Sequence, residues 1–292
     1  MDNEKYLHAL DEFIKSALQE DVGDGDHSTL SCINEDASGK AILKIKDSGI
    51  IAGIDVAEKI FNFIEKDSHL KFFKKDGDYV QPGDIAFEVS ASIHTILKAE
   101  RLVLNCMQRM SGIATLTNLY VKELKNYSTK LLDTRKTTPN FRLLEKEAVR
   151  IGGGYNHRFG LYDMIMLKDN HIDYCGGIKK ALEKASQYVQ NKKPGLKIEI
   201  ETRSLQEVIE AVSTGKADRI MLDNFKPSEI VDAMEIINGV CETEASGGIT
   251  LANIQSYAAT GVDFVSSGAI IHQAQSLDLS LKAEIERDEQ KK

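Results

Sequence analysis

Cationic side chains that could bind an anion follow two apolar runs in the second half of the chain. The run KLLDTRK ends in Arg135 and Lys136, and the run MIML is closed by Lys168, shortly after the pair His157 and Arg158. Arginine can bind a carboxylate through two parallel hydrogen bonds, and lysine supplies a compact positive charge. A solvated turn and a structural histidine are the alternatives, although an apolar run argues against a simply exposed Lys168. The pattern predicts an anion-binding pocket.

The charge balance supports a pocket for a small anion. From residue 135 to residue 168 the chain has seven lysines and arginines but only three acidic residues, whereas its net charge is −8. A basic pocket in an acidic protein suits a small, highly charged anion better than a polymer. A nucleic-acid-binding surface would need a broad basic footprint, so we expect no nucleic-acid partner.

Carboxylates and glycine-rich turns close the other apolar runs. Glu201 and Asp223 end two of them, where they can hold Mg²⁺, usually through water, or accept hydrogen bonds from sugar hydroxyls. The turns ASGG (245–248) and SSGAI (267–271) are typical of the phosphate site of an α/β barrel. Charges that seal a barrel rim and ligand-free tight turns are the alternatives. The histidines lack the spacing of a zinc site.

Alternating strands and helices must position these residues. Short apolar runs cover 130–136, 164–170, 197–201, 219–224, 240–248 and 264–268, and amphipathic segments separate them. Such alternation predicts a parallel sheet. Six strands fit either an open doubly wound sheet or a barrel of fewer than eight strands. The reactive residues end many different runs rather than one crevice, which favours the barrel.

The first third of the chain has a different pattern. Helical periodicity covers 6–19 and 56–66, strand character covers 41–51, and 74–90 contains strands broken by Asp-Gly and Pro-Gly turns. We expect an α+β, sandwich-like domain over 1–112 and the barrel over 113–273. Residues 274–292 can join the first domain. One or two helices over 96–125 connect the two parts.

Composition limits the class of protein. Hydrophobic residues make up 42% and charged residues 28% of 292 residues, which is an ordinary globular mixture. No apolar run has the length of a membrane span, and residues 1–20 lack the pattern of a signal peptide. We therefore expect a cytoplasmic protein without a membrane partner. The four cysteines form no CxxC pair, so we expect reduced thiols.

The motifs together resemble the quinolinate phosphoribosyltransferase family, also called nicotinate-nucleotide pyrophosphorylase (carboxylating). The resemblance runs from LQEDVGDGDHST through ERLVLNCMQRMSGIAT, DTRKTTP, GGGYNHRFGLYDMIMLKDNHI, EIE, LDNF and EASGGI to SSGAI, over nearly the whole chain. DTRKTTP with HR and LKDNH is the specific part, whereas single glycine turns are not. The resemblance implies an N-terminal α/β sandwich and an incomplete, seven-stranded parallel α/β barrel. The six runs are one strand short of that number.

The resemblance implies phosphoribosyl transfer from phosphoribosyl diphosphate to quinolinate, with decarboxylation to nicotinate mononucleotide in NAD biosynthesis. It implies Mg²⁺ and a homodimer, or a higher multiple of dimers, in which Arg101 reaches the partner's site. The implied quinolinate-binding residues are Arg101, Arg135, Lys136, His157, Arg158 and Lys168. Glu201 and Asp223 would hold ribose and, indirectly, magnesium, and Ser246, Gly247, Gly248, Gly268 and His272 would bind the 5′-phosphate. Lys136, Lys168, Glu201 and Asp223 are the expected catalytic residues.

Two other functions fit part of the pattern. A related transferase could use another carboxylated acceptor, and a non-catalytic protein could bind a phosphorylated metabolite on the same scaffold. The complete set of cations favours quinolinate, and the retained Lys136, Lys168, Glu201 and Asp223 favour an enzyme. The sequence departs from the family at Asn140, where many members have glycine.

Overall fold

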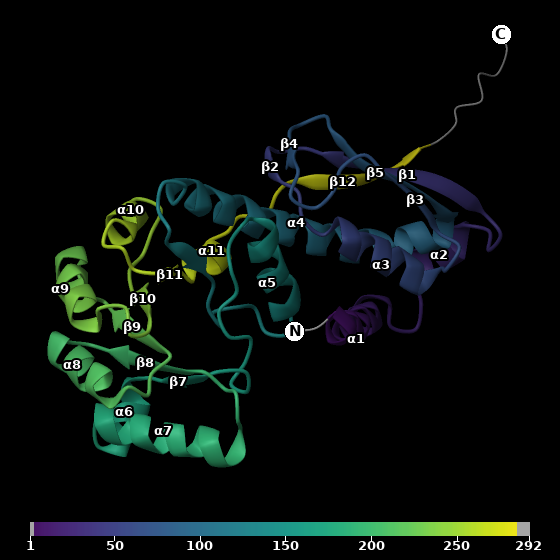
Figure 1. The fold of residues 1–292 in the computed structure, drawn as a ribbon. Coiled ribbons are helices and arrows are strands. Elements are labelled where there is room, and N and C mark those ends of the chain that lie inside the picture. The colour runs from purple at the N-terminus through teal and green to yellow at the C-terminus, as the bar shows by residue number, and fades with distance from the viewer. Residues whose placement is uncertain (1–2, 285–292) are drawn as a thin grey trace, which may run out of the picture. The chain divides into compact units, whose positions relative to one another are not determined.

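The computed structural model describes residues 3–284, which form two compact units (Figure 1). The first unit contains residues up to 116, the segment 138–152, and the chain from 273 onward. The second contains 117–137 and 153–272. The segment 138–152 therefore groups with the first unit, although it lies within the range expected for the barrel.

An antiparallel sheet forms the centre of the first unit. Its strand order is β12-β1-β5-β3, and a separate pair joins β2 to β4. The bounds are β1 (Ser38–Ile45), β2 (Gly49–Ile50), β3 (His69–Phe72), β4 (Tyr79–Val80), β5 (Ile85–Ser92) and β12 (Leu279–Glu284). The purple β1 and the yellow β12 lie side by side in Figure 1, so chain from beyond the barrel completes this sheet.

Five helices accompany this sheet: α1 (Asn3–Val22), α2 (His27–Cys32), α3 (Ile54–Ile64), α4 (Ile93–Glu123) and α5 (Arg142–Ile151). The apolar side of α3 faces the sheet, where the rings of Phe61 and Phe87 meet edge to face at 6.3 Å. The expected helix over 96–125 is the single helix α4. Its Ser111 hydroxyl accepts the Ala52 N–H at 2.9 Å, which fixes the chain before α3.

The second unit is a curved parallel sheet covered by helices. The order is β6-β11-β10-β9-β8-β7, and all pairs are parallel. The bounds are β6 (Lys130–Leu132), β7 (Ile165–Leu167), β8 (Ile198–Thr202), β9 (Arg219–Asp223), β10 (Glu242–Ser246) and β11 (Phe264–Ser266). Each of the six predicted runs thus contains a strand.

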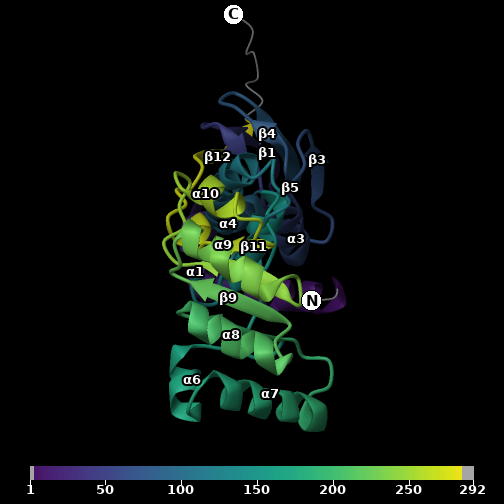
Figure 2. The ribbon, with the colours of Figure 1, turned by 60° about the vertical axis from the view of Figure 1, so that its left-hand side comes forward.

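The covering helices lie in the amphipathic segments between the strands and after the last strand. They are α6 (Asp169–Cys175), α7 (Ile178–Lys192), α8 (Leu205–Thr214), α9 (Pro227–Ile237), α10 (Ile254–Ala258) and α11 (Ala269–His272). Helices α7, α8 and α9 pack side by side (Figure 2). Ser204 caps α8 by accepting the Glu207 N–H, and Pro227 occupies the first turn of α9.

The seventh strand of the expected barrel is reduced to one bridge at Tyr155. The Tyr155 N–H donates to the Leu131 carbonyl at 2.8 Å, and the Asp133 N–H donates to the Tyr155 carbonyl at 3.0 Å. This parallel bridge adds Tyr155 to the free side of β6, at the opposite end of the sheet from β7. Because the surrounding GGGYN sequence has no apolar run, strand periodicity could not locate it.

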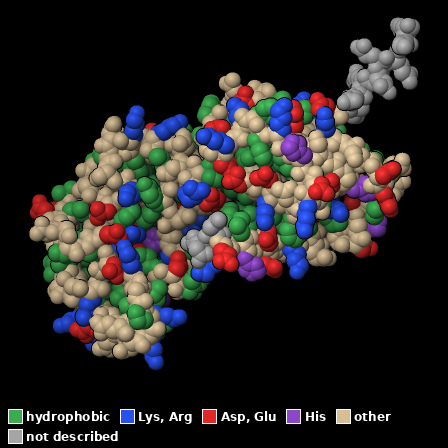
Figure 3. Space-filling model, turned by 45° about the vertical axis from the view of Figure 1, so that its right-hand side comes forward, with side chains coloured by type: hydrophobic (Ala, Val, Ile, Leu, Met, Phe, Trp, Pro, Cys, Tyr) green, Lys and Arg blue, Asp and Glu red, His purple; other side chains and the backbone are tan. Residues whose placement is uncertain are grey.

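Within residues 3–284 we find no helix with both the length and the apolar character that crossing a membrane requires. The four cysteines are free thiols. On the face shown in Figure 3, basic and acidic side chains are interspersed, and no broad basic area covers that face.

Candidate active site

The strand order places most of the predicted residues along one edge of the second unit. Carboxyl ends of parallel strands share an edge, so the order of the strands gives the order of the side chains. Along this edge Arg135 and Lys136 follow β6, Gly268 follows β11, the turn from Ser246 to Gly248 follows β10, and Asp223, Glu201 and Lys168 lie at β9, β8 and β7. Cations, glycine turns and carboxylates are thus neighbours on one rim.

The carboxylate end of this rim has the electrostatics of a cation site. The Lys168 Nζ lies 3.2 Å from the Glu201 Oε2, and Glu201 is buried. Burial and the nearby Glu201 raise the pKa of Asp223, against the lowering effects of the Asn224 amide and Lys168. A divalent cation or a sugar hydroxyl between the two carboxylates would relieve this repulsion, so the donor set fits magnesium.

Two glycines let neighbouring loops approach closely. A Cβ on Gly247, whose φ is 92°, would lie 2.9 Å from the Asn224 backbone nitrogen. A Cβ on Gly268 would lie 2.9 Å from the Lys136 Cδ and 3.2 Å from the His272 Cδ2. Lys136, Gly268 and His272 therefore meet at one point, as an anion site with a lysine and a histidine requires.

The charges of Arg135 and Arg158 interact on the cationic side of the rim. Burial and the nearby Arg135 lower the pKa of Arg158, because each positive charge is unfavourable to the other. The Arg158 Nη1 also donates to the Met164 carbonyl at 3.3 Å, which orients the guanidinium. A bound carboxylate would compensate both positive charges.

Not every cation of the basic stretch belongs to this rim. Arg142, Lys146 and Arg150 lie on α5, in the first unit, and Arg150 is paired with Glu147 on the same helix. Arg101 is exposed on α4, also in the first unit. Of the seven cations between 135 and 168, the second unit therefore contains four, which are Arg135, Lys136, Arg158 and Lys168.

The structure does not support a direct role for His157 in binding a substrate carboxylate. The residue is only 8% exposed, and its Nε2 lies 2.9 Å from the Glu199 Oε2 and 3.4 Å from the Glu244 Oε2. Its Nδ1 accepts the Arg158 N–H at 2.6 Å. Both ring nitrogens are therefore engaged within the protein, and the ring faces two carboxylates rather than the rim.

Three residues of this interior cluster escaped the sequence analysis: Glu199, Arg219 and Glu244. The Arg219 Nη1 donates to the Glu244 Oε2 at 3.1 Å, and its Nη2 donates to the Glu242 Oε2 at 2.9 Å. A usable signal existed, because strand residues two apart share a face. Glu199 lies two positions before Glu201, and Glu244 lies two before Ser246.

The cluster also shows that the sheet is curved. His157 follows the bridge at one end of the sheet, yet its ring touches side chains of β8 and β10 from the middle of the strand order. A flat sheet would hold these residues several strands apart, at about 4.8 Å per strand. The sheet must therefore curl into an incomplete barrel with a charged layer inside it.

A proton rather than a metal ion fits between His157, Glu199 and Glu244, although their ligand atoms lie within 4.8 Å of one another. Because Nδ1 accepts the Arg158 N–H, the ring proton is on Nε2, which leaves that nitrogen no lone pair for a metal. Burial and Glu244 raise the pKa of Glu199 to about 7. Burial lowers the pKa of His157, but its contacts with Glu199 and Glu244 outweigh this and raise the pKa to about 9. With both pKa values raised, the cluster keeps one further proton near neutral pH. We place this proton on the Glu199 carboxyl group, because Nδ1 of His157 already accepts a hydrogen bond.

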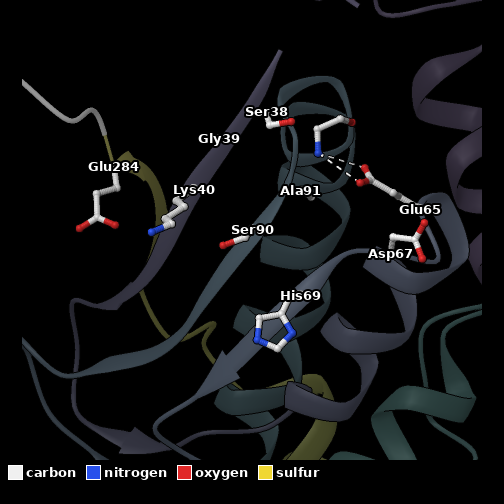
Figure 4. Close-up of a pocket in the computed structure, with 10 residues that line it drawn as sticks. Ser38, Gly39, Lys40, Glu65, Asp67, His69, Ser90, Ala91 and Glu284 are labelled. Carbon is white, nitrogen blue, oxygen red and sulfur yellow. Dashed lines mark hydrogen bonds between the residues drawn. The ribbon is translucent and has the colours of Figure 1, made fainter. Parts of the chain in front are cut away.

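A pocket of about 670 Å³ lies elsewhere, on the antiparallel sheet of the first unit (Figure 4). Lys40, Glu65, His69 and Glu284 contribute charges of mixed sign to it. The Glu65 carboxylate is already bound by the Ser92 N–H, as the dashed lines in Figure 4 show. The pocket contains none of the predicted site residues, and its groups lack the convergence seen at the barrel rim.

Comparisons with known proteins agree with this geometry. Residues 26–111 match the model of the quinolinate phosphoribosyl transferase N-terminal domain, and residues 113–282 match the model of the C-terminal domain. A chloroplastic nicotinate-nucleotide pyrophosphorylase (carboxylating) of Arabidopsis thaliana is 44% identical, over 95% of this chain and 83% of the relative. A probable nicotinate-nucleotide pyrophosphorylase (carboxylating) of Bacillus subtilis is 41% identical, over 93% and 92% of the two chains.

A solved structure gives the same result for the fold. The crystal structure of NadC from Streptococcus pyogenes superposes with a TM-score of 0.87 at 41% identity, and it covers 94% of this chain and 95% of its own. The match includes both units, so the sandwich and the incomplete barrel are shared. The family models, the close relatives and the arrangement of the barrel rim lead to one conclusion: this chain belongs to the quinolinate phosphoribosyltransferase family.

Proposed function

We propose that this chain transfers the phosphoribosyl group of phosphoribosyl diphosphate to quinolinate and decarboxylates the product to nicotinate mononucleotide. One observation carries the proposal: a single rim holds the cations Arg135 and Lys136, two glycine turns and a lysine–carboxylate group in strand order. Both substrates are polyanions, so a cationic site is required for each.

The residues divide into two halves of the reaction. Arg135 and Arg158 hold the carboxylates of the pyridine, where their mutual repulsion makes an anion favourable. Gly268 and His272 lie where we place the 5′-phosphate, and Lys136, which the resemblance assigns to the pyridine carboxylates, lies beside both, so we assign it to the phosphate as well. His157 is revised here from a carboxylate ligand to an interior residue.

Glu201 and Asp223 face the ribose, whose anomeric carbon becomes positively charged as diphosphate leaves. Preorganised carboxylates stabilise this charge electrostatically, and Lys168 holds Glu201 in place. A bound Mg²⁺ would assist departure of the diphosphate as a Lewis acid. We propose Glu201 and Asp223 as its holders, through water.

We also propose a homodimer in which Arg101 serves the partner's site. Arg101 lies on α4 and not at a strand end, so its own barrel has no strand to present it. A two-fold dimer would build two equivalent shared sites. The cytoplasmic location remains a prediction from the sequence, and the Arabidopsis relative is named as chloroplastic.

Turnover of three acceptors tests the activity. Purified protein is mixed with phosphoribosyl diphosphate, Mg²⁺ and either quinolinate, nicotinate or nicotinamide, and release of carbon dioxide and diphosphate is followed. We expect quinolinate alone to react, because a mono-acid leaves a cation without its partner at a cost of several kcal/mol, by order of magnitude. Comparable kcat/KM for nicotinate would refute the assignment.

Lys168→Ala tests the carboxylate end. We expect kcat to fall by roughly 10²-fold, the scale of removing a preorganised charge, with the fold retained and a melting temperature lowered by only a few degrees, because the Lys168 side chain is half-exposed. Lys197→Ala is the matched control, since Lys197 directly precedes β8 and its side chain is 59% exposed beside Glu242. A normal rate in Lys168→Ala would reduce Lys168 to a surface cation.

A further inference from the structure

Several charged side chains form a layer inside the barrel, where apolar side chains would be the usual filling. Barrel interiors are usually filled by branched apolar side chains. Here Glu199, Glu244 and His157 are each at least 92% buried, and Arg219 is 8% exposed. Buried charges are costly unless they are paired, so these residues need a reason to be present.

The layer anchors the segment that carries Arg158. The His157 ring lies between the Glu199 and Glu244 carboxylates, at 2.9 and 3.4 Å, and Arg219 holds Glu244 at 3.1 Å. On its other nitrogen the same ring accepts the Arg158 N–H at 2.6 Å. The ring therefore links the barrel interior directly to the backbone of Arg158.

A second contact fixes the same segment from β6. The His157 N–H donates to the Asp133 Oδ1 at 2.8 Å, and Asp133 is fully buried. Asp133 lies two residues before Arg135 in the chain. The two arginines whose charges influence each other are thus tied to one buried hydrogen-bond network.

We propose that Glu199 and Glu244, with Arg219 behind them, are positioning residues that hold His157 inside the barrel and thereby set Arg158 for binding a carboxylate of the pyridine acceptor. This inference rests on the proposed function for the ligand, but the anchoring itself does not. The interior glutamates act at a distance, through the ring and the Arg158 N–H. Glu199 and Glu244 share β8 and β10 with Glu201 and Ser246, but it is His157 that they contact, and through it the Arg158 N–H. Their loss should therefore weaken acceptor binding more than binding of phosphoribosyl diphosphate.

Steady-state kinetics of three variants test the role. Glu199→Leu removes the carboxyl group that lies 2.9 Å from Nε2 at similar volume, and we expect the KM for quinolinate to rise roughly tenfold, the scale of one buried polar contact. Its KM for phosphoribosyl diphosphate should stay within about twofold. Glu199→Gln keeps an acceptor oxygen and should restore most of the affinity, which a purely electrostatic or cavity effect would not predict.

Glu242→Leu is the matched control. Glu242 lies on the same strand as Glu244 and is also bound by Arg219, at 2.9 Å, but its side chain is 38% exposed. It makes no ion pair with His157 among those of residues 3–284. We expect both KM values within about twofold of the wild type. An equal rise in Glu242→Leu, or equal rises for both substrates in Glu199→Leu, would overturn the positioning role.

Nitrogen NMR of the wild-type histidines tests the anchoring without turnover. Long-range ¹H–¹⁵N correlations, assigned with His157→Gln, should show a neutral-type Nδ1 and a protonated Nε2 that exchanges slowly with water. An Nδ1-protonated or freely exchanging ring would overturn the inference. If this signature is present while quinolinate is not turned over, the proposed function fails and the anchoring stands.

Discussion

Two carboxylates on α5 provide a sharp test of burial, because they lie two residues apart and each pairs with an arginine. Glu145 is fully buried and binds Arg109, whose side chain is 24% exposed. Glu147 binds Arg150, whose side chain is 65% exposed. The perturbations are Arg109→Met and Arg150→Met, which remove the same charge and leave a similar volume.

The expected magnitudes follow from the partners of each carboxylate. Glu145 accepts the Arg109 Nε and Nη2 at 3.0 and 2.8 Å, and the Thr138 N–H and hydroxyl at 2.8 and 2.9 Å. Removing one partner of a buried ion pair costs about 3–5 kcal/mol. We expect about 3 kcal/mol, since the Thr138 donors remain. The exposed Arg150 pair should contribute less than about 1 kcal/mol.

Thermal unfolding followed by calorimetry measures the difference. Arg109→Met should lower the melting temperature by roughly 10 °C, and Arg150→Met by no more than roughly 3 °C. The double variant Arg109→Met/Glu145→Leu should recover part of the loss, because no uncompensated charge is left and water can reach the exposed Thr138. Equal shifts in the two single variants, or a double variant no better than Arg109→Met, would refute the reasoning.

Three further predictions concern other parts of the chain. Burial raises the pKa of Asp76 from 3.8 to about 6. The folded state therefore keeps a proton that the unfolded state has lost, so stability should fall as pH rises through this range, and Asp76→Asn should abolish the fall in urea unfolding. Gly247→Ala forces a side chain at φ 92° against Asn224 and should cost about 2 kcal/mol, with a higher KM for phosphoribosyl diphosphate; unchanged stability and KM would contradict it. Mixing inactive Arg101→Ala and Lys136→Ala subunits should restore roughly a quarter of wild-type activity, because half the dimers are hybrids with one intact site of two. No recovery despite verified exchange would mean that Arg101 acts in its own subunit or only in the fold.

Short stretches of sequence were enough to predict the barrel strands and the residues that end them. Each run from 130–136 to 264–268 overlaps a strand, and α8 and α9 lie in the amphipathic segments between the runs. Apolar runs report burial, and a polar residue after such a run reports a strand end, whatever the rest of the chain does. The departure at Asn140 is also explained locally, since its φ of 62° suits asparagine almost as well as glycine.

The environment of each charge was decided only by the tertiary structure. Glu145 is fully buried beside an arginine 36 residues away, whereas Glu147, two residues later, keeps 23% of its side chain exposed beside Arg150. The place of His157 depends likewise on Glu199 and Glu244, which lie on two strands not adjacent in the sheet.

The sequence by itself determined the six strands of the barrel, which residues end them, and the family to which those motifs belong, but it did not predict α2, β3, α5 or β12. The tertiary structure alone decided that the seventh strand is a single bridge at Tyr155, that 138–152 joins the first unit, and that a charged layer fills the barrel. The physical reason is the distance along the chain between the residues that interact. Periodicity records which side chains share a face of one element, whereas partners across a closed sheet are chosen by curvature and long-range pairing, which no short stretch of sequence encodes.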